Sequence, residues 1–313
     1  AGWFGRFNYD YKGIYLLEFN GRYDGSSRFP AADQWAFFPS GSIGYRFSEE
    51  GYFKPLKSWW SNGKLRASYG EVGNEAVGNN MFLATVESGT SNWLNASGQY
   101  LNNLGLPKLV SRTLSWERIC TTDVGVDLGF FNNSLNVGFD WYQRDTKDML
   151  ARGMDLPSVL GTTAPYTNAG ALRTRGWEIS ASWNHSFGDA DIYISANLSD
   201  ATTKVTRWNG VDVIYSFNTG SFYEGGTYGD IWGFETDRFF EESDFTGKDA
   251  DGNWIYAPGI ADQSALQTGT FRYGPGDIKF ADLNGDGVIN NGDPNMVDEN
   301  GERIPVGTHR NHG

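Results

Sequence analysis

The feature that most constrains the fold of this chain is the alternation in its connections, because strand-like segments are joined in turn by a few residues and by dozens. The short connections lie at residues 12–13, 132–133 and 188–190, with a longer one on the same side at 48–63, and the long connections lie at 25–34, 71–118, 151–174 and 208–305. Loops of that length are uncommon in compact soluble domains. A membrane β-barrel has short periplasmic turns at one rim and long extracellular loops at the other. The sequence therefore predicts an all-β fold, an antiparallel transmembrane β-barrel segment.

The strand-like segments alternate between apolar and polar side chains, a period of two that gives each kind its own face of a strand. About eight such segments can be traced, over residues 3–9, 14–23, 35–47, 64–70, 121–130, 134–150, 175–187 and 191–206. We expect the apolar face to contact lipid, with Tyr15, Phe19, Trp141 and Trp183 on it, and the polar face to line a pore, with Glu18, Arg22, Asp140 and Glu178 on it. An arginine should then cost more at Phe139 than at Asn136.

Composition agrees with a barrel and argues against a helical membrane protein. Aromatic residues make up 16% of the 313 residues, which suits the interfacial girdles of a barrel. No apolar run approaches the roughly 20 residues of a spanning helix. Residues 235–303 hold fifteen Asp and Glu against five Lys and Arg, which gives this segment a net charge of −10. The formal net charge of the whole chain is −13. Such a surface repels nucleic acid backbones, so no nucleic acid partner is expected.

Nothing in the sequence assembles a catalytic centre. The three histidines are His185, near the end of a strand-like segment, and His309 and His312, near residue 313. Spacing combines none of them with a nucleophile and an orienting acid. The acidic pair Glu241 and Glu242 is better explained as solvated charge on a loop. We therefore predict that the chain is not an enzyme.

The sharpest local motif is DLNGDGVINNGD, over residues 282–293. Its spacing matches a calcium loop, with a glycine at the sixth position and oxygen-bearing groups at positions one, three, five, seven, nine and twelve. Position twelve departs from the EF-hand pattern, because an Asp stands where a bidentate Glu is usual. A plain acidic turn has the same Asn-Gly-Asp-Gly letters and remains the alternative. The predicted Ca²⁺ ligands are Asp282, Asn284, Asp286, Val288, Asn290 and Asp293.

Several stretches together carry a family resemblance, in the order in which they occur. They are NYDYKGIYLLEFNGRYDGSSRF (8–29), WAFFPSGSIGYRFSEE (35–50), KLRASYGEVGN (64–74), TNAGALRTRGWEIS (167–180) and GDIKFADLNGDGVI (276–289). The chain resembles the C-terminal part of the barrel of SusC/RagA-type TonB-dependent outer-membrane transporters, and the resemblance covers most of its length.

This resemblance implies a location in the bacterial outer membrane and a barrel of about 22 strands. It also implies import of oligosaccharides or peptides through the lipid bilayer, a SusD-like surface lipoprotein as partner, and energy from TonB acting through a plug region that is expected before Ala1. We accordingly predict about eight barrel strands in residues 1–207, a long extracellular loop region with the calcium-type loop in 208–305, and the start of a further strand in 306–313.

Two other classes stay open on the residues alone. Eight strands could close on themselves as a small outer-membrane barrel, acting as an adhesin or a porin, if the last strand paired with the first. A soluble carbohydrate-binding β-sandwich would instead gather its exposed aromatic side chains into one platform. Unpaired strand edges are costly in lipid, so a membrane barrel that does not close within these residues needs further strands from elsewhere.

Overall fold

A computed structural model describes residues 1–111, 113–152, 156–209, 223–229, 232–283, 285–290 and 309–311. The chain divides into two compact units, Ala1–Val211 and Asp212–Gly313. No helix in the described ranges is long and apolar enough to cross a membrane.

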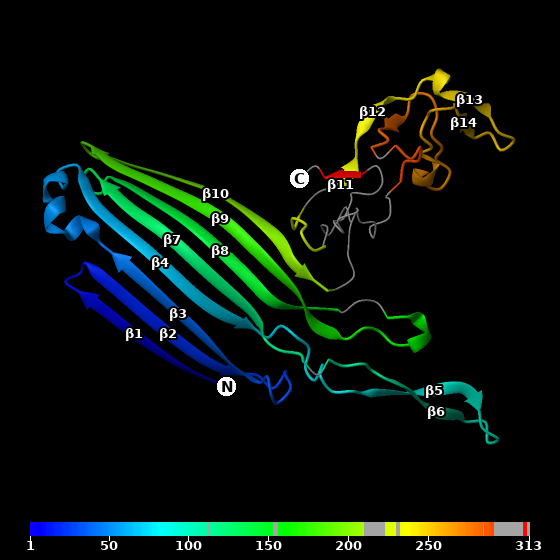
Figure 1. Cartoon of the computed structure of the whole chain (residues 1–313), viewed down its shortest axis with the longest axis horizontal. Coiled ribbons are helices and arrows are strands. Elements are labelled where there is room, and N and C mark those ends of the chain that lie inside the picture. The colour runs from blue at the N-terminus through cyan, green and yellow to red at the C-terminus, as the bar shows by residue number, and fades with distance from the viewer. Residues whose placement is uncertain are drawn as a thin grey trace. The chain divides into compact units, whose positions relative to one another are not determined.

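The first unit is built on an antiparallel sheet of eight strands, in the order β1-β2-β3-β4-β7-β8-β9-β10 (Figure 1). Each of the eight predicted segments is found as one of these strands. Within the described residues β1 and β10 are the two edges of the sheet, so closure of eight strands on themselves is not supported. The strands are β1 (Gly2–Tyr11), β2 (Tyr15–Gly25), β3 (Trp35–Tyr45), β4 (Trp60–Asn74), β7 (Glu117–Phe130), β8 (Leu135–Arg152), β9 (Tyr166–Phe187) and β10 (Ala190–Trp208).

One end of this sheet, which we call the turn end, carries the short connections. Lys12 and Gly13 join β1 to β2 with φ of 58° and 66°, and Asn132 and Asn133 join β7 to β8 with φ of 55° and 62°. Gly188 has φ 62° in the turn between β9 and β10. Gly, Asn and other small polar residues tolerate such left-handed dihedrals, which tight hairpins require. The longer β3–β4 connection at this end contains two 3-10 helices, η1 (Phe47–Glu49) and η2 (Gly51–Leu56).

The opposite end, the loop end, carries the long connections predicted from the sequence. The connection from β4 to β7 contains a hairpin that the sequence did not predict, formed by β5 (Val86–Leu94) and β6 (Tyr100–Pro107) (Figure 1). The connection from β8 to β9 contains the 3-10 helix η3 (Ser158–Leu160). The strands also run further toward this end than predicted, since β9 begins at Tyr166.

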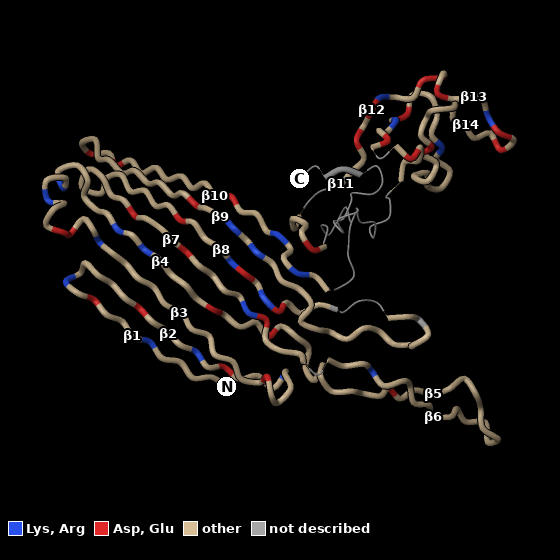
Figure 2. The backbone as a smooth tube through the Cα atoms, viewed as in Figure 1, with Lys and Arg blue, Asp and Glu red and all other residues tan. Residues whose placement is uncertain are grey.

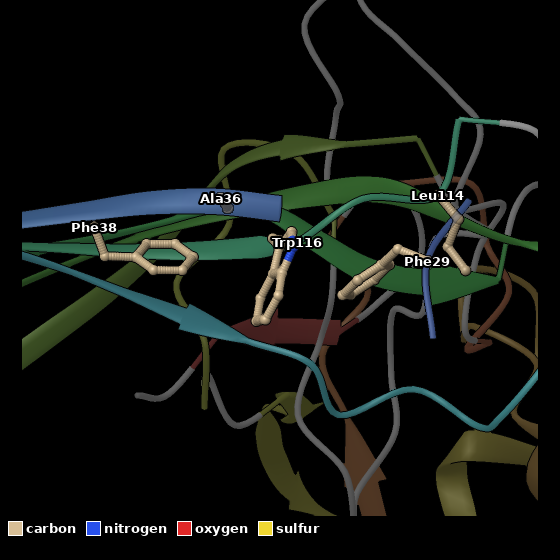
Figure 3. Packing of buried hydrophobic residues seen from close by; sticks show 5 residues of the cluster. All are labelled: Phe29, Ala36, Phe38, Leu114 and Trp116. Atoms are coloured by element: carbon tan, nitrogen blue, oxygen red, sulfur yellow. The ribbon is translucent and has the colours of Figure 1, made fainter. Parts of the chain in front are cut away.

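A small apolar core lies at the loop end of the sheet. It joins Phe29 from the β2–β3 loop, Phe38 from β3, and Leu114 and Trp116 from the segment before β7 (Figure 3). The Trp116 ring lies 5.0 Å from the Phe29 ring and 5.5 Å from the Phe38 ring, measured between centroids. Phe38 is paired with Arg22 and so projects from the polar face of the sheet. Loops therefore pack against the polar face, where they are anchored by aromatic contacts.

The second unit is a set of small two-stranded sheets. Their strands are β11 (Trp232–Phe234), β12 (Thr236–Phe239), β13 (Phe245–Lys248), β14 (Trp254–Tyr256), β15 (Ile278–Phe280) and β16 (His309–Asn311), with the 3-10 helices η4 (Glu242–Asp244) and η5 (Ser264–Leu266). Phe240, Phe245 and Ile289 are buried among them. Of residues 306–313, for which a further barrel strand is predicted, the structure describes β16, which pairs with β11.

Candidate functional site

Strand register divides the large sheet into an apolar face and a polar face. One transverse row on the apolar face runs from Leu17 through Ile43, Ala67 and Val124 to Trp141 and Trp177. The next row toward the turn end runs through Tyr15, Tyr45, Leu65, Val126, Phe139, Ile179 and Leu198. Many of these side chains are exposed in the chain by itself, Leu198 to 62%. A band of exposed apolar residues on one sheet face is the outer surface of a membrane barrel.

The polar face carries the candidate pore lining. A row there runs through Asn8, Glu18, Ser42, Ser68 and Asp123, and the adjacent row through Arg66, Gly125, Asp140, Glu178 and Ser199. The predicted residues Glu18, Arg22, Asp140 and Glu178 all belong to this face, and Tyr15, Phe19, Trp141 and Trp183 belong to the apolar face. Figure 2 shows charged residues of both signs distributed along these strands.

The most connected group on the polar face is centred on Arg66 of β4. Its guanidinium lies 3.2 Å from the Asp127 carboxylate, 2.5 Å from that of Asp140 and 3.6 Å from that of Asp123. The side chain is about one-third exposed, at 32%. One cation therefore ties β4 to two carboxylates of β7 and one of β8. Sequence reasoning did not single out Arg66; its alternation with Leu65 and Ala67 is the signal that could have assigned it to the polar face.

This arrangement depends on the absence of a side chain at Gly125. The residue lies between Arg66 and Asp140 in the register, so the arginine has to cross β7 to reach β8. A Cβ atom at Gly125 would overlap the Asp140 carboxylate and come within 2.8 Å of the Arg66 guanidinium carbon. Glycine in a strand often marks such a close approach.

The polar face is hollowed beside this group. A hollow of about 510 Å³ is lined by residues of β1 to β4 and β7, among them Glu18, Ser42, Lys64, Arg66 and Asp123. The wall of this hollow offers hydroxyl groups, carboxylates and cations within one space. Such a lining can form hydrogen bonds with a polar solute and stays hydrated, as the lumen of a barrel does.

The calcium-type loop lies in the second unit and is described in part. Asn284 and Asp293 lie outside the described residues. Both carboxylate oxygens of Asp282 accept hydrogen bonds, one from the amide of Gly285 and one from that of Gly287, each at 2.9 Å. Asp286 accepts a hydrogen bond of 2.8 Å from the amide of Val288.

The backbone of this loop has the curvature that a calcium loop needs. Gly287, at the sixth position, has φ 80°, and Gly285 has φ 75°. The loop end is fixed, because the Asp262 amide donates to the Gly287 carbonyl and the Ile289 amide donates to the Asp262 carbonyl, both at 2.8 Å. Among the described residues no three acidic, histidine or cysteine side chains gather as a metal site. The described part of the loop is thus an acidic turn in which the carboxylates of Asp282 and Asp286 accept hydrogen bonds from backbone amides.

A buried ion pair stabilises the same unit. Asp244 is 4% exposed and receives hydrogen bonds of 2.6 and 2.7 Å from the two terminal nitrogens of Arg238. It also accepts a hydrogen bond from the Glu241 amide. The Arg238 hydrogen bonds, with a smaller contribution from this amide, lower the pKa of Asp244 to about 2. The carboxylate therefore stays ionised at every physiological pH.

Comparison with known proteins agrees with this geometry. Residues 1–290 match the family model described as TonB dependent receptor-like, beta-barrel. The chain is 29% identical to TonB-dependent receptor P3 of Formosa agariphila over 307 residues, covering 94% of the chain and 28% of that protein. It is 27% identical to TonB-dependent receptor SusC of Bacteroides thetaiotaomicron, covering 90% of the chain and 30% of SusC.

Solved structures give the same result. The RagAB peptide importer in its closed-closed state aligns with a TM-score of 0.68 and 26% identity, over 83% of this chain and 29% of that one. The structure of the RagAB peptide transporter aligns with a TM-score of 0.67 and 27% identity, over 86% and 28%. The chain thus spans less than a third of the length of these relatives. With its two-faced antiparallel sheet, it belongs to the TonB-dependent receptor β-barrel family, as part of a SusC/RagA-type barrel of the bacterial outer membrane.

Proposed function

We propose that this chain forms part of the wall of an outer-membrane importer that takes up oligosaccharides or peptides. The observation that carries the proposal is the continuous polar face of the sheet, with its hollow beside Glu18 and Arg66. A lining of this kind suits the passage of polar solutes, and RagAB, a structural relative, is described as a peptide importer. The role is transport and not catalysis.

The proposal extends to partners. A SusD-like surface lipoprotein would cover the loop end, and TonB would supply energy through a plug region of the full-length protein. The support is similarity to SusC and to RagAB, of which this chain spans 30% and 29%. Affinity purification of the full-length protein from the outer membrane, followed by mass spectrometry, is expected to recover one lipoprotein in equal amount.

The import function can be tested by deleting the full-length gene and measuring growth and uptake on single oligosaccharides and on peptides. We expect loss of uptake for one of these classes, with restoration by the wild-type gene. Unchanged uptake of every solute of both classes would contradict the proposal. Loss of TonB or of the proton gradient should abolish the same uptake.

A matched pair of substitutions tests whether the polar face lines the path. Ser42 lies in the hollow on the polar face, whereas Leu65 of β4 is exposed on the apolar face and does not line the hollow. Ser42→Trp is expected to slow uptake at equal surface expression, because it narrows the hollow, whereas Leu65→Trp should leave the rate unchanged. Equal rates for the two variants would show that this face is not on the path.

We further propose that the loop of residues 282–293 binds one Ca²⁺. Asp282, Asn284, Asp286, Asn290 and Asp293 would supply side-chain oxygens, and Val288 its carbonyl. Ionised carboxylates have lone pairs beyond those used by the amides of Gly285 and Gly287, and hard cations prefer such oxygens. The ion would neutralise charge in an acidic loop and hold its shape.

Calorimetry on the full-length protein tests the metal site. Asp286→Ala should reduce the number of bound Ca²⁺ by one per chain. Asp251→Ala is the matched control, because Asp251 lies in a similar acidic turn between β13 and β14 whose hydrogen bonds close a plain hairpin tip. Identical calcium uptake by wild type and Asp286→Ala would remove the site and favour the acidic-turn alternative.

A further inference from the structure

A group of basic side chains lies on the apolar face of the sheet, at its loop end. On that face of β9, Arg175 is the next side chain beyond Trp177 in the direction of the loop end, and Arg173 is the next one beyond Arg175. Lys204 of β10 is directly opposite Arg173. Figure 2 shows basic residues collected on β8, β9 and β10 near this end. We call the group the outer basic cluster; its members are Lys147, Arg173, Arg175, Lys204 and Arg207.

The position of the cluster relative to the apolar band is defined by the strands. Trp141 and Trp177 are paired in the last apolar row before the cluster. Side chains two residues apart on a strand are separated by roughly 7 Å, so Arg175 and Arg173 lie about 7 and 14 Å beyond the Trp177 position along β9. Asp145, which is opposite Arg173, lies ten residues from Leu135; this corresponds to about 33 Å along the strand and, at a tilt of about 40°, to about 25 Å of depth, the height of the apolar band. Arg173 and Lys204 are therefore at the level of lipid head groups in the outer leaflet. Arg175 lies about 5 Å nearer the midplane, a distance that its long side chain can span.

The charge of the cluster is not balanced by its neighbours. The carboxylates on this face beside the cluster are Asp145, which pairs with Arg173 at 2.6 Å, Asp148, which pairs with Arg207 at 3.0 Å, and Asp200, which is opposite Trp177 and makes no ion pair with a described residue. Five cations and three carboxylates leave +2, in a chain whose formal net charge is −13. Lys147 and Lys204 are both exposed and make no ion pair with a described residue.

Two arginines of the cluster keep N–H donors that an external ligand could bind. Arg173 uses its Nε atom to bind Asp145, and Arg175 uses Nε to bind Gln143 at 2.8 Å. The terminal nitrogens of both exposed guanidinium groups make no hydrogen bond with described residues. Arg173 and Lys204 form a directly opposed pair of like charges, which is destabilising in a sheet unless an anion lies between them.

We propose that the outer basic cluster binds the phosphate groups of an anionic lipid in the outer leaflet. Charge complementarity selects this ligand, since guanidinium groups bind phosphate in a bidentate manner and lysine acts as a point charge. The apolar rows immediately beside the cluster would contact the acyl chains of the same molecule. A soluble acidic protein could use the cations but not this adjoining apolar surface.

The test uses the full-length protein in neutral detergent and measures binding of bisphosphorylated lipid A by fluorescence titration. Dephosphorylated lipid A and inorganic phosphate are the two comparison ligands. Each basic side chain near a membrane surface contributes roughly a fivefold change in affinity. We therefore expect roughly a 25-fold weaker affinity in the Arg173→Gln, Lys204→Gln double variant, and a fivefold weaker one in Arg175→Gln.

Arg144→Gln is the matched control, because Arg144 is exposed on β8 at a similar height but on the opposite face of the sheet. Its lipid affinity should equal that of wild type. Unchanged affinity in the cluster variants overturns the proposal, and so does an equal loss in Arg144→Gln. Equally tight binding of dephosphorylated lipid A, or full competition by inorganic phosphate at matched concentration, also overturns it. Lost retention of a co-purifying acidic protein with unchanged lipid affinity would assign the cluster to a protein contact instead.

Discussion

Replacement of Phe139 by arginine tests the assignment of the two faces. Phe139 is 39% exposed on the apolar face of β8, where it pairs with Val126 and Ile179. It lies four residues from Leu135, the first residue after the turn, which corresponds to about 13 Å along the strand. With a strand tilt of about 40°, the depth is about 10 Å in an apolar band of about 25 Å. The side chain is therefore close to the bilayer midplane.

The expected cost follows from this depth. An arginine on the lipid face at the midplane destabilises a barrel by about 2 to 4 kcal/mol. Loss of the aromatic cross-strand pairs adds up to about 1 kcal/mol. The matched control is Ser180→Arg, because Ser180 follows Ile179 on β9 and lies at the same depth on the polar face, beside Gly138 and Asn197. We expect the control to cost less than about 1 kcal/mol, since water hydrates an arginine in the lumen.

The assay is a urea titration of the full-length protein folded into phosphatidylcholine vesicles. Tryptophan fluorescence and the mobility of unheated samples in gels both report the folded fraction. Asn136→Arg serves as a second polar-face control, although it also removes the hydrogen bond from the Asn136 side chain to the Asn133 carbonyl. Equal free energies of unfolding for Phe139→Arg and Ser180→Arg would refute the facing assignment, and with it the pore.

Two further predictions concern the ion pairs. A methyl group at Gly125 would overlap the Asp140 carboxylate, so Gly125→Ala should lower the free energy of unfolding by about 1 kcal/mol in the same titration. Gly5→Ala, which meets no atom within 4 Å, should not, and equal losses would exclude the steric cause. Because the pKa of Asp244 is lowered to about 2 from 3.8, its ion pair with Arg238 stabilises the second unit fully above pH 3.8, and this contribution is lost as the pH falls toward 2. Hydrogen exchange of residues 232–283 should show a loss of about 1 to 2 kcal/mol of protection across that window in wild type and no such step in Asp244→Asn; an identical step in both would identify another group.

The strands of the sheet could be predicted because two independent signals agree. Side chains of period two define each strand, and turns such as Lys12–Gly13 define where consecutive strands reverse. The hairpin of β5 and β6 gave no such signal. Its first strand, VESGTSNWL, is mostly polar on both faces and pairs only with β6, in a two-stranded sheet separate from the large one. The sequence pattern is thus informative where the strand has one apolar face.

The Arg66 group shows what sequence patterns cannot supply. Alternation assigns Arg66, Asp127 and Asp140 to one face of their strands, but their contact depends on the register between β4, β7 and β8. Register is set by pairing across residues far apart in the chain, here 61 and 74 positions. The calcium-type loop is the opposite case, because its spacing is local; its predicted ligands Asn284 and Asp293 lie outside the described residues and stay a prediction.

The two faces of the sheet are stabilised by different forces, and this explains where the charges lie. The apolar face is covered by lipid, whereas a water-facing wall gains no comparable burial along its length. Each exposed ion pair contributes at most about 1 kcal/mol, so Arg66 adds little stability through any single carboxylate. Its effect is geometric, because one planar group fixes the positions of Asp123, Asp127 and Asp140 across β4, β7 and β8. A wall that must present fixed polar groups to a passing solute needs such a constraint, and Gly125 leaves the space in which it forms.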